Sequence, residues 1–267
     1  MVAVLGAGKI GQAVSRILSK RAEVSEVILT KRNLATLGNR LPKKYVLESD
    51  NVKAAKKADV VIMAVKAADA KKLADQISES VDGKLVISLM AAISISRLER
   101  HMPGAKVVRA MTNIAATIGE AVTAFACGSK TKEMDKELAV KVLGSLGDAV
   151  EVPESAMDAV TALSGSGPAY IAILIDAMVS AGLKVGLSRD VALRLSIGTL
   201  NGTANLITAK RMRPDELRDL VTTPAGTTIA GIYELEKGSF RTSIMNAVEA
   251  ATAAAGRVAK KFETEGE

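Results

Sequence analysis

Met1-Val-Ala-Val-Leu-Gly-Ala-Gly-Lys-Ile-Gly11 opens the chain as an apolar strand that runs into three spaced glycines and then into a helical pattern. This order of strand, glycine-rich turn and helix is the context that a dinucleotide-binding fingerprint requires. In that fingerprint Gly6 makes the tight turn, Gly8 lets the backbone approach a pyrophosphate, and Gly11 lets helix and strand pack closely. We therefore expect an α/β domain that binds a dinucleotide at this turn.

Short apolar runs alternate with helical patterns through the first half of the chain. Continuous apolar runs, such as residues 59–65, are typical of strands buried on both faces of a parallel sheet. Their alternation with helices predicts a Rossmann-type doubly wound sheet. After the first strand, further strands are expected at 26–30, 45–48, 59–65, 84–90, 106–111, 122–127 and 149–152, with helices at 51–59 and 132–146.

Strand signals stop near Pro153, and helical periodicity continues from there. We predict a dinucleotide-binding domain over residues 1–152 and an all-α domain over residues 153–267. No segment rich in Gly, Ser or Pro separates them, so we expect direct packing. The apolar run 169–183 contains Asp176 and is short for a membrane span, which favours a buried helix. Other helices are expected at 155–163, 189–210, 214–220, 227–236 and 242–261, with a break at the glycines before Pro168.

Composition and charge argue against a nucleic-acid-binding protein and against a metal site. The 267 residues are 48% hydrophobic but only 2% aromatic, which predicts an aliphatic core. The formal net charge is +7 without a lysine–arginine block or interleaved aromatic residues, which argues against nucleic-acid binding. Cys127 is the single cysteine and His101 the single histidine; we expect a core thiol, a surface imidazole and no metal site. The first strand begins at residue 2, so we expect no targeting peptide and a cytoplasmic location.

The end of the second strand carries a signal for the type of dinucleotide. It reads Thr30-Lys31-Arg32, without an acidic residue. A fold that prefers NADH usually places an acid here for the ribose hydroxyls, whereas a 2′-phosphate needs cations. We therefore predict NADPH, with NADH as a weaker substitute. The alternative interpretation is that these cations are ordinary surface charges.

A second turn, Val221-Thr-Thr-Pro-Ala-Gly-Thr-Thr228, lies between two expected helices of the C-terminal half. Proline is tolerated in the first turn of a helix, and Thr222 or Thr223 would cap the helix that follows. Free amides at a helix N-terminus favour an anion, and threonine hydroxyls donate or accept hydrogen bonds without carrying charge. We interpret this threonine turn (residues 221–228) as a pocket for a small carboxylic acid; an ordinary capped turn is the alternative.

Four motifs, in this order and spacing, resemble pyrroline-5-carboxylate reductase, the last enzyme of proline biosynthesis, over essentially the whole chain. They are Gly6-x-Gly8-x-x-Gly11, Ala64-Val-Lys66, Ser164-Gly-Ser-Gly-Pro-Ala-Tyr170 and the threonine turn. The stretch 219–235 is the most specific, and 108–113 also fits. This sequence has Ala67, Ile114-Ala115 and Ala225 where the family commonly has proline, Thr-Pro and glycine, which puts cofactor affinity in question more than the reaction.

The resemblance implies NADPH-dependent hydride transfer to the cyclic imine 1-pyrroline-5-carboxylate, giving L-proline. It also implies a homodimer intertwined through the helical domain, and a larger ring such as a decamer. With Lys31 and Arg32 from the end of the second strand included, the residues expected at the cofactor are Gly6, Ala7, Gly8, Lys9, Ile10, Gly11, Thr30, Lys31, Arg32, Asn51, Ala64, Val65, Lys66 and Ala92. Those expected at the substrate are Ala225, Gly226, Thr227 and Thr228, and Thr228 is expected to be catalytic through a hydrogen bond to the ring nitrogen.

Two other functions stay open at this point. Hydride transfer to a protonated imine needs no metal, nucleophile or strong base, which suits this sequence. A β-hydroxyacid dehydrogenase-like enzyme would need a lysine base, for which Lys184 and Lys210 are the candidates. A non-enzymatic regulator that senses NADPH would not need the threonine turn.

Overall fold

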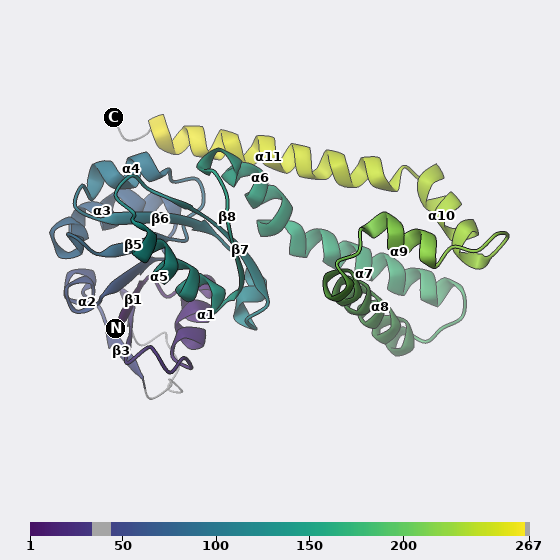
Figure 1. The fold of residues 1–267 in the computed structure, drawn as a ribbon, viewed down its shortest axis with the longest axis horizontal. Helices are drawn as coiled ribbons and strands as arrows, with labels where there is room; N and C mark the ends of the chain where they lie inside the picture. Colours follow the sequence, from purple (N-terminus) through teal and green to yellow (C-terminus); the bar gives the residue numbers. More distant parts are fainter. Residues whose placement is uncertain (34–43, 265–267) are drawn as a thin grey trace. The chain divides into compact units, whose positions relative to one another are not determined.

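The computed structural model describes residues 1–33 and 44–264, which form two compact units (Figure 1). The first unit comprises Met1–Ser166 and the chain from Glu249 onward, and the second comprises Gly167–Val248. The sheet ends at Glu151, beside the predicted boundary after residue 152, whereas the first unit continues to Ser166. The functional division into domains 1–152 and 153–267 stays a prediction.

The described part of the first unit contains an eight-stranded sheet in the order β3-β2-β1-β4-β5-β6-β7-β8. Pairing is parallel from β3 to β6 and again between β7 and β8, and the β6–β7 pair is antiparallel. This confirms the predicted Rossmann-type sheet. The strands are β1 Val2–Leu5, β2 Val27–Thr30, β3 Tyr45–Glu48, β4 Val60–Met63, β5 Leu85–Ser88, β6 Lys106–Met111, β7 Ala121–Cys127 and β8 Gly147–Glu151.

Helices cover both faces of the sheet, because its central strands are apolar on both sides. Helices α1 (Lys9–Leu18) and α5 (Glu133–Gly144) pack on one face through residues such as Val14 and Leu143. Helices α2 (Asn51–Lys57), α3 (Ala70–Ile77) and α4 (Ile95–His101) pack on the other, where Phe262 of the last helix also contributes. Both faces of the sheet are therefore covered by apolar side chains, and the loops at its edge start from buried strands.

The register of the parallel strands places their carboxyl ends in one row. Leu5 at the end of β1 pairs with Thr30 of β2 and with Met63 of β4, and Met63 pairs with Ser88 of β5. Ligands of open parallel sheets bind beyond this edge. The segments that follow β1, β2, β4, β5 and β6 therefore line one common rim.

The second unit is helical. Its described elements are α7 (Gly167–Lys184), α8 (Arg189–Lys210), α9 (Pro214–Leu220), α10 (Thr227–Lys237) and residues 240–248 at the start of α11 (Phe240–Thr264). Helices α7 and α8 approach closely at Gly182, where an added Cβ would lie 2.7 Å from the Ala192 Cβ. The predicted bounds of α8 and α9 are confirmed. The predicted helix break before Pro168 is instead a π-helical turn, Thr161–Gly165, that follows the short helix α6 (Met157–Val160).

The prediction that the apolar run 169–183 is a buried helix is wrong for the single chain. Only Val179 is buried in α7, while the side chains of Ile171 and Ile173 are 49% and 70% exposed. An apolar pattern all around a helix indicates burial but does not say which chain provides it. Residues 154–184 are also long and apolar enough to cross a membrane by length and composition alone, a test that core helices of soluble proteins pass as well.

Candidate functional site

The glycine turn after β1 is packed so tightly that two of its glycines have no room for a side chain. Gly6 has φ +108°, and a Cβ there would lie 2.7 Å from the Ala64 carbonyl oxygen. A Cβ on Gly11 would lie 1.9 Å from the Gly6 carbonyl oxygen, whereas one on Gly8 would meet nothing within 4 Å. Gly8 is the N-cap of α1 and no side chain caps that helix. The first-turn amides of α1 are thus open towards a ligand on the Gly8 side, which fits a pyrophosphate.

Thr30 at the end of β2 holds the glycine turn in place. Its buried hydroxyl accepts a hydrogen bond from the Gly6 amide at 3.2 Å and donates one to Asn51 Oδ1 at 2.7 Å. Asn51 begins α2, which is capped by Asp50. Because the Thr30 hydroxyl makes both of these hydrogen bonds, Thr30 positions the turn, and its expected contact with the cofactor stays a prediction.

Arg32 reaches from the end of β2 across to the loop after β4. Its Nη2 atom lies 3.0 Å from Asp69 Oδ2, and its side chain is 89% exposed. Lys31 follows Thr30 and makes no ion pair within the described residues. Sequence reasoning missed Asp69, because an acid six residues beyond a strand carries no local signal.

The loops after β4, β5 and β6 complete the rim. Ala64 continues β4 through a hydrogen bond from its amide to the Leu5 carbonyl at 2.8 Å, followed by Val65 and Lys66. Ala92, after β5, has φ +65°, an uncommon conformation for a residue with a Cβ. Ala64 and Val65 pack against the glycine turn, because an added Cβ on Gly6 would lie 2.7 Å from the Ala64 carbonyl oxygen and 2.8 Å from Val65 Cγ1. Their expected contact with the cofactor stays a prediction.

Two motifs that are distant in the sequence meet at the end of β6. The Asn113 side-chain amide donates to the Ser164 carbonyl at 3.2 Å and lies 3.3 Å from the Ser164 hydroxyl. An added Cβ on Gly165 would lie 3.7 Å from Met111 Sδ. The structure therefore brings the segment 108–113 together with the start of Ser164-Gly-Ser-Gly, which the sequence analysis treated as separate features.

An ion pair between β6 and Glu154 lies near this region, and sequence reasoning missed it. Arg109 on β6 bonds Glu154 at 3.0 Å, and the two side chains are 8% and 33% exposed. The same Glu154 oxygen accepts the Ile95 amide at 2.7 Å. An arginine inside the apolar strand Lys106–Met111 was the available signal, because a buried guanidinium needs a partner.

The threonine turn lies in the second unit between α9 and α10. Neither Thr222 nor Thr223 caps α10, which corrects that prediction: the N-cap is Gly226, and no side chain caps the helix. The Thr222 hydroxyl instead donates back to the Arg218 carbonyl at 2.6 Å. The three residues Pro224-Ala225-Gly226 shift the helix start to Thr227, beyond the reach of the two earlier hydroxyls.

The open end of α10 has the geometry of a small anion site. Ala225 has φ +57°, and a Cβ on Gly226 would lie 2.3 Å from Thr223 Oγ1. The first turn of α10 contains no acidic residue, and its first amides lack intrahelical partners. Thr227 is exposed and Thr228 is half-buried. Ala225, Gly226, Thr227 and Thr228 are thus brought together around free amides and two hydroxyls.

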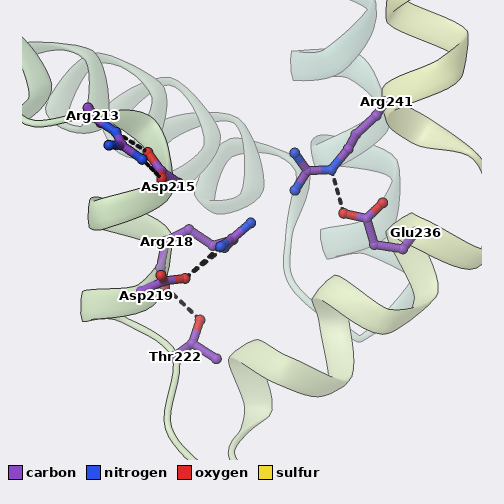
Figure 2. A network of polar contacts seen from close by, with 7 residues as sticks. All are labelled: Arg213, Asp215, Arg218, Asp219, Thr222, Glu236 and Arg241. Carbon is purple, nitrogen blue, oxygen red and sulfur yellow. Dashed lines mark hydrogen bonds and ion pairs between the residues drawn. The ribbon is translucent and has the colours of Figure 1, made fainter.

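Exposed ion pairs lie on the helices on either side of this turn (Figure 2). In α9, Arg218 Nη2 and Nε lie 2.7 and 2.9 Å from Asp219 Oδ1, and Arg213 binds Asp215 at the helix start. Hydrogen bonding from Arg213 lowers the pKa of the Asp215 carboxyl. Beyond α10, Arg241 Nε bonds Glu236 at 2.5 Å.

Other polar residues have structural surroundings. His101 Nδ1 lies 2.7 Å from Asp75 Oδ1 with a side chain 15% exposed. Cys127 is only half-buried, although it was expected in the core, and burial with the nearby Glu151 charge raises the pKa of its thiol. Asp176 on α7 is exposed in the single chain and has no ion pair among the described residues.

Comparison with families of known proteins matches both parts of the chain. The family described as pyrroline-5-carboxylate reductase dimerisation matches residues 154–258. The family described as NADP oxidoreductase coenzyme F420-dependent matches residues 1–92. One match thus covers the glycine turn and the loops after β2, β4 and β5, and the other covers the threonine turn.

Individual relatives match over almost the full length. The chain is 35% identical over 261 residues to a pyrroline-5-carboxylate reductase of Synechocystis sp., covering 97% of this chain and 98% of the relative. It is 36% identical to the enzyme of that name from Methanosarcina acetivorans, with the same coverage. A solved Plasmodium falciparum pyrroline carboxylate reductase with NADP bound has a TM-score of 0.86 at 28% identity, over 97% of both chains. A Mycobacterium tuberculosis 3-hydroxyisobutyrate dehydrogenase, at 17% identity and a TM-score of 0.51, shares the fold alone.

Proposed function

This chain belongs to the pyrroline-5-carboxylate reductase family, and on that premise we propose which of its residues carry the reaction. It is an NADPH-dependent oxidoreductase that reduces 1-pyrroline-5-carboxylate to L-proline. The carbon–nitrogen double bond accepts a hydride at carbon, and the nitrogen ends as a secondary amine. The protein must therefore bind one dinucleotide, one carboxylate and one ring nitrogen.

The rim of the sheet is proposed to hold the cofactor, which supplies the hydride when bound. The first-turn amides of α1, beside Gly8, would bind the pyrophosphate, because they are uncapped and face open space. Lys31 and Arg32 would bind the 2′-phosphate. The remaining predicted contacts, at Asn51 and at the small residues of the β4 and β5 loops (Ala64, Val65, Lys66 and Ala92), stay proposals for the nucleoside and nicotinamide parts.

The threonine turn is proposed to hold the substrate. The observation that carries this is the uncapped start of α10, where Gly226 and the amides of Thr227 and Thr228 offer donors to a carboxylate. The half-buried Thr228 hydroxyl would then accept a hydrogen bond from the protonated ring nitrogen and orient the ring. A hydroxyl is a poor acid, so the substrate's own proton or water completes the amine. Orientation in this way supplies catalysis through positioning.

A homodimer through the helical unit is proposed as the working form, and a decamer as its further assembly. Support comes from the exposed apolar side chains of α7 and α8, including Ile173 and Leu195 at 70% and 55% exposure. The dimerisation family that matches residues 154–258 covers both helices. We also propose a cytoplasmic location, where reduced NADPH is available, without membrane or nucleic-acid partners.

The test compares wild type with Thr228→Ala and Thr228→Ser, using NADPH and 1-pyrroline-5-carboxylate. We expect Thr228→Ala to lower kcat by about 10- to 100-fold, because a hydrogen bond to a charged group is lost. Thr228→Ser keeps the hydroxyl and should retain most of the activity. Thr222→Ala is the matched control on the same turn, because the Thr222 hydroxyl bonds the Arg218 carbonyl, and it should keep the wild-type kcat.

The control readout is NADP⁺ binding, which all three variants should keep at the wild-type dissociation constant. Wild-type kcat in Thr228→Ala would remove the catalytic role of Thr228 while leaving the reaction assignment intact. Equal loss in Thr228→Ala and Thr228→Ser would show that the hydroxyl is not the active feature.

A further inference from the structure

The ion pair between Arg32 and Asp69 joins the loops on either side of the glycine turn. Arg32 follows β2 and Asp69 ends the 3-10 turn Ala67–Asp69 after β4, and these two strands flank β1 in the sheet. The Nη2-to-Oδ2 distance is 3.0 Å. The pair therefore joins the two segments that border the end of β1, where the dinucleotide-binding turn begins.

The Arg32–Asp69 ion pair can be displaced by another anion. The Arg32 guanidinium has five N–H donors, and Asp69 bonds it through Nη2. Among the described residues no other acceptor bonds this guanidinium, so its remaining N–H groups can bind a second anion. The two side chains are 89% and 40% exposed, and an exposed pair of this kind contributes little to stability. A phosphate carries more charge than a carboxylate and accepts charge-assisted, often bidentate, hydrogen bonds from arginine.

Within the part of the chain that the structure describes, the Asp69 carboxylate is not held by another partner. Asp69 lies between the 3-10 turn Ala67–Asp69 and α3, and its side chain makes no capping hydrogen bond to that helix. Its side chain is 40% exposed, so water can solvate the carboxylate when Arg32 leaves, which lowers the cost of separating the pair.

We propose that Asp69 is a specificity-determining residue that holds Arg32 in the free enzyme and yields it to the 2′-phosphate of NADPH. The proposal rests on the proposed cofactor role of Arg32. Asp69 competes with the 2′-phosphate for the guanidinium and so weakens NADPH binding relative to an enzyme that lacks this carboxylate. NADH has no 2′-phosphate, leaves the pair intact, and is bound independently of Asp69.

The test is calorimetric titration of NADP⁺ and of NAD⁺ into wild type, Asp69→Asn, Arg32→Ala and the double variant at low salt. Asp69→Asn should tighten NADP⁺ binding by about two- to fivefold, the range expected for an exposed pair. Its NAD⁺ dissociation constant should stay at the wild-type value. In the Arg32→Ala background the same substitution should lose most of its effect on NADP⁺.

Asp75→Asn is the matched control, because it removes a half-exposed carboxylate of α3 that pairs with Lys71 and His101 instead. It should leave NADP⁺ binding unchanged. Three results would overturn the proposal: weaker NADP⁺ binding in Asp69→Asn, equal tightening of both dinucleotides, or an equal effect of Asp75→Asn. Failure of the wild type to bind NADP⁺ at all would instead contradict the proposed function.

Discussion

At the scale of single residues, the absence of a Cβ sets the geometry of both turns. Gly6 and Gly11 are closed in by backbone atoms, while Gly8 faces open space. The strand–turn–helix context predicted the tight turn at Gly6 and the close packing at Gly11, because these constraints are local. The role of Gly8 at a pyrophosphate stays a prediction. The sequence did not predict that Gly226 would be the N-cap of α10, since Thr222 and Thr223 satisfy the same capping rule. The helix starts only after Pro224-Ala225-Gly226, where Ala225 has a left-handed φ.

The glycine turn gives a paired prediction. Gly11→Ala should destabilise the first unit by about 3 kcal/mol or more, because its Cβ would lie 1.9 Å from the Gly6 carbonyl and backbone must move. Gly8→Ala meets no atom within 4 Å and has an ordinary φ of −72°, so the unfolding midpoint should stay near that of wild type. It should weaken NADP⁺ binding by about tenfold or more, because pyrophosphate contacts are lost. Urea unfolding and NADP⁺ titration check both, and a Gly8→Ala variant that binds normally would contradict the proposed pyrophosphate site.

Ala225 gives a second prediction at this scale. A left-handed φ of +57° costs a residue with a Cβ about 1–2 kcal/mol, whereas glycine adopts it freely. Glycine also gains freedom in the unfolded chain, so the expected net stabilisation by Ala225→Gly is about 0.5–1 kcal/mol. Ala230→Gly, within α10, should instead destabilise by about 1 kcal/mol. Chemical unfolding of both variants is the measurement, and a destabilised Ala225→Gly would show that the turn is unstrained.

At the scale of elements, periodicity and turn signals predicted most helices and strands, because these depend on neighbouring residues. β3 and β6 have the predicted bounds, and β4 and β5 lie inside the predicted apolar runs. The antiparallel direction of β7 was not predicted, because a strand's own sequence does not fix its pairing partner. The same holds for Arg32–Asp69, which joins two loops brought together by the sheet order, and for Asn113–Ser164, which joins the end of β6 to the π-helical turn Thr161–Gly165.

The edge strand β3 gives a prediction about pH. Burial raises the pKa of Tyr45 to about 12, against the opposing charge of Arg16 on α1. A raised pKa means that the folded state favours the neutral phenol, so this stability is complete below the unfolded value of 10.0 and is lost as the pH rises to about 12. The unfolding midpoint of wild type should fall over this range more than that of Tyr45→Phe. Matching midpoints from pH 10.0 to about 12 would contradict the burial of this side chain.

At the scale of the whole molecule, the single chain leaves apolar helices uncovered. Ile173 on α7 is 70% exposed although the helix pattern predicted burial. We expect Ile173→Lys to convert the dimer to monomer in sedimentation velocity, because it places a charge in the proposed interface. Met134→Lys alters a side chain that is 82% exposed on the first unit and should leave the assembly intact. An unchanged sedimentation coefficient for Ile173→Lys would exclude this face of α7 from the interface.

One chain carries both the proposed NADPH site on the sheet rim and the proposed imine site at the threonine turn. The most direct measurement is the stoichiometry of NADPH consumed and L-proline formed when the purified wild-type protein is mixed with 1-pyrroline-5-carboxylate. We expect one proline per NADPH, with slower turnover when NADH replaces it. A folded protein that binds NADPH but forms no proline would contradict the account.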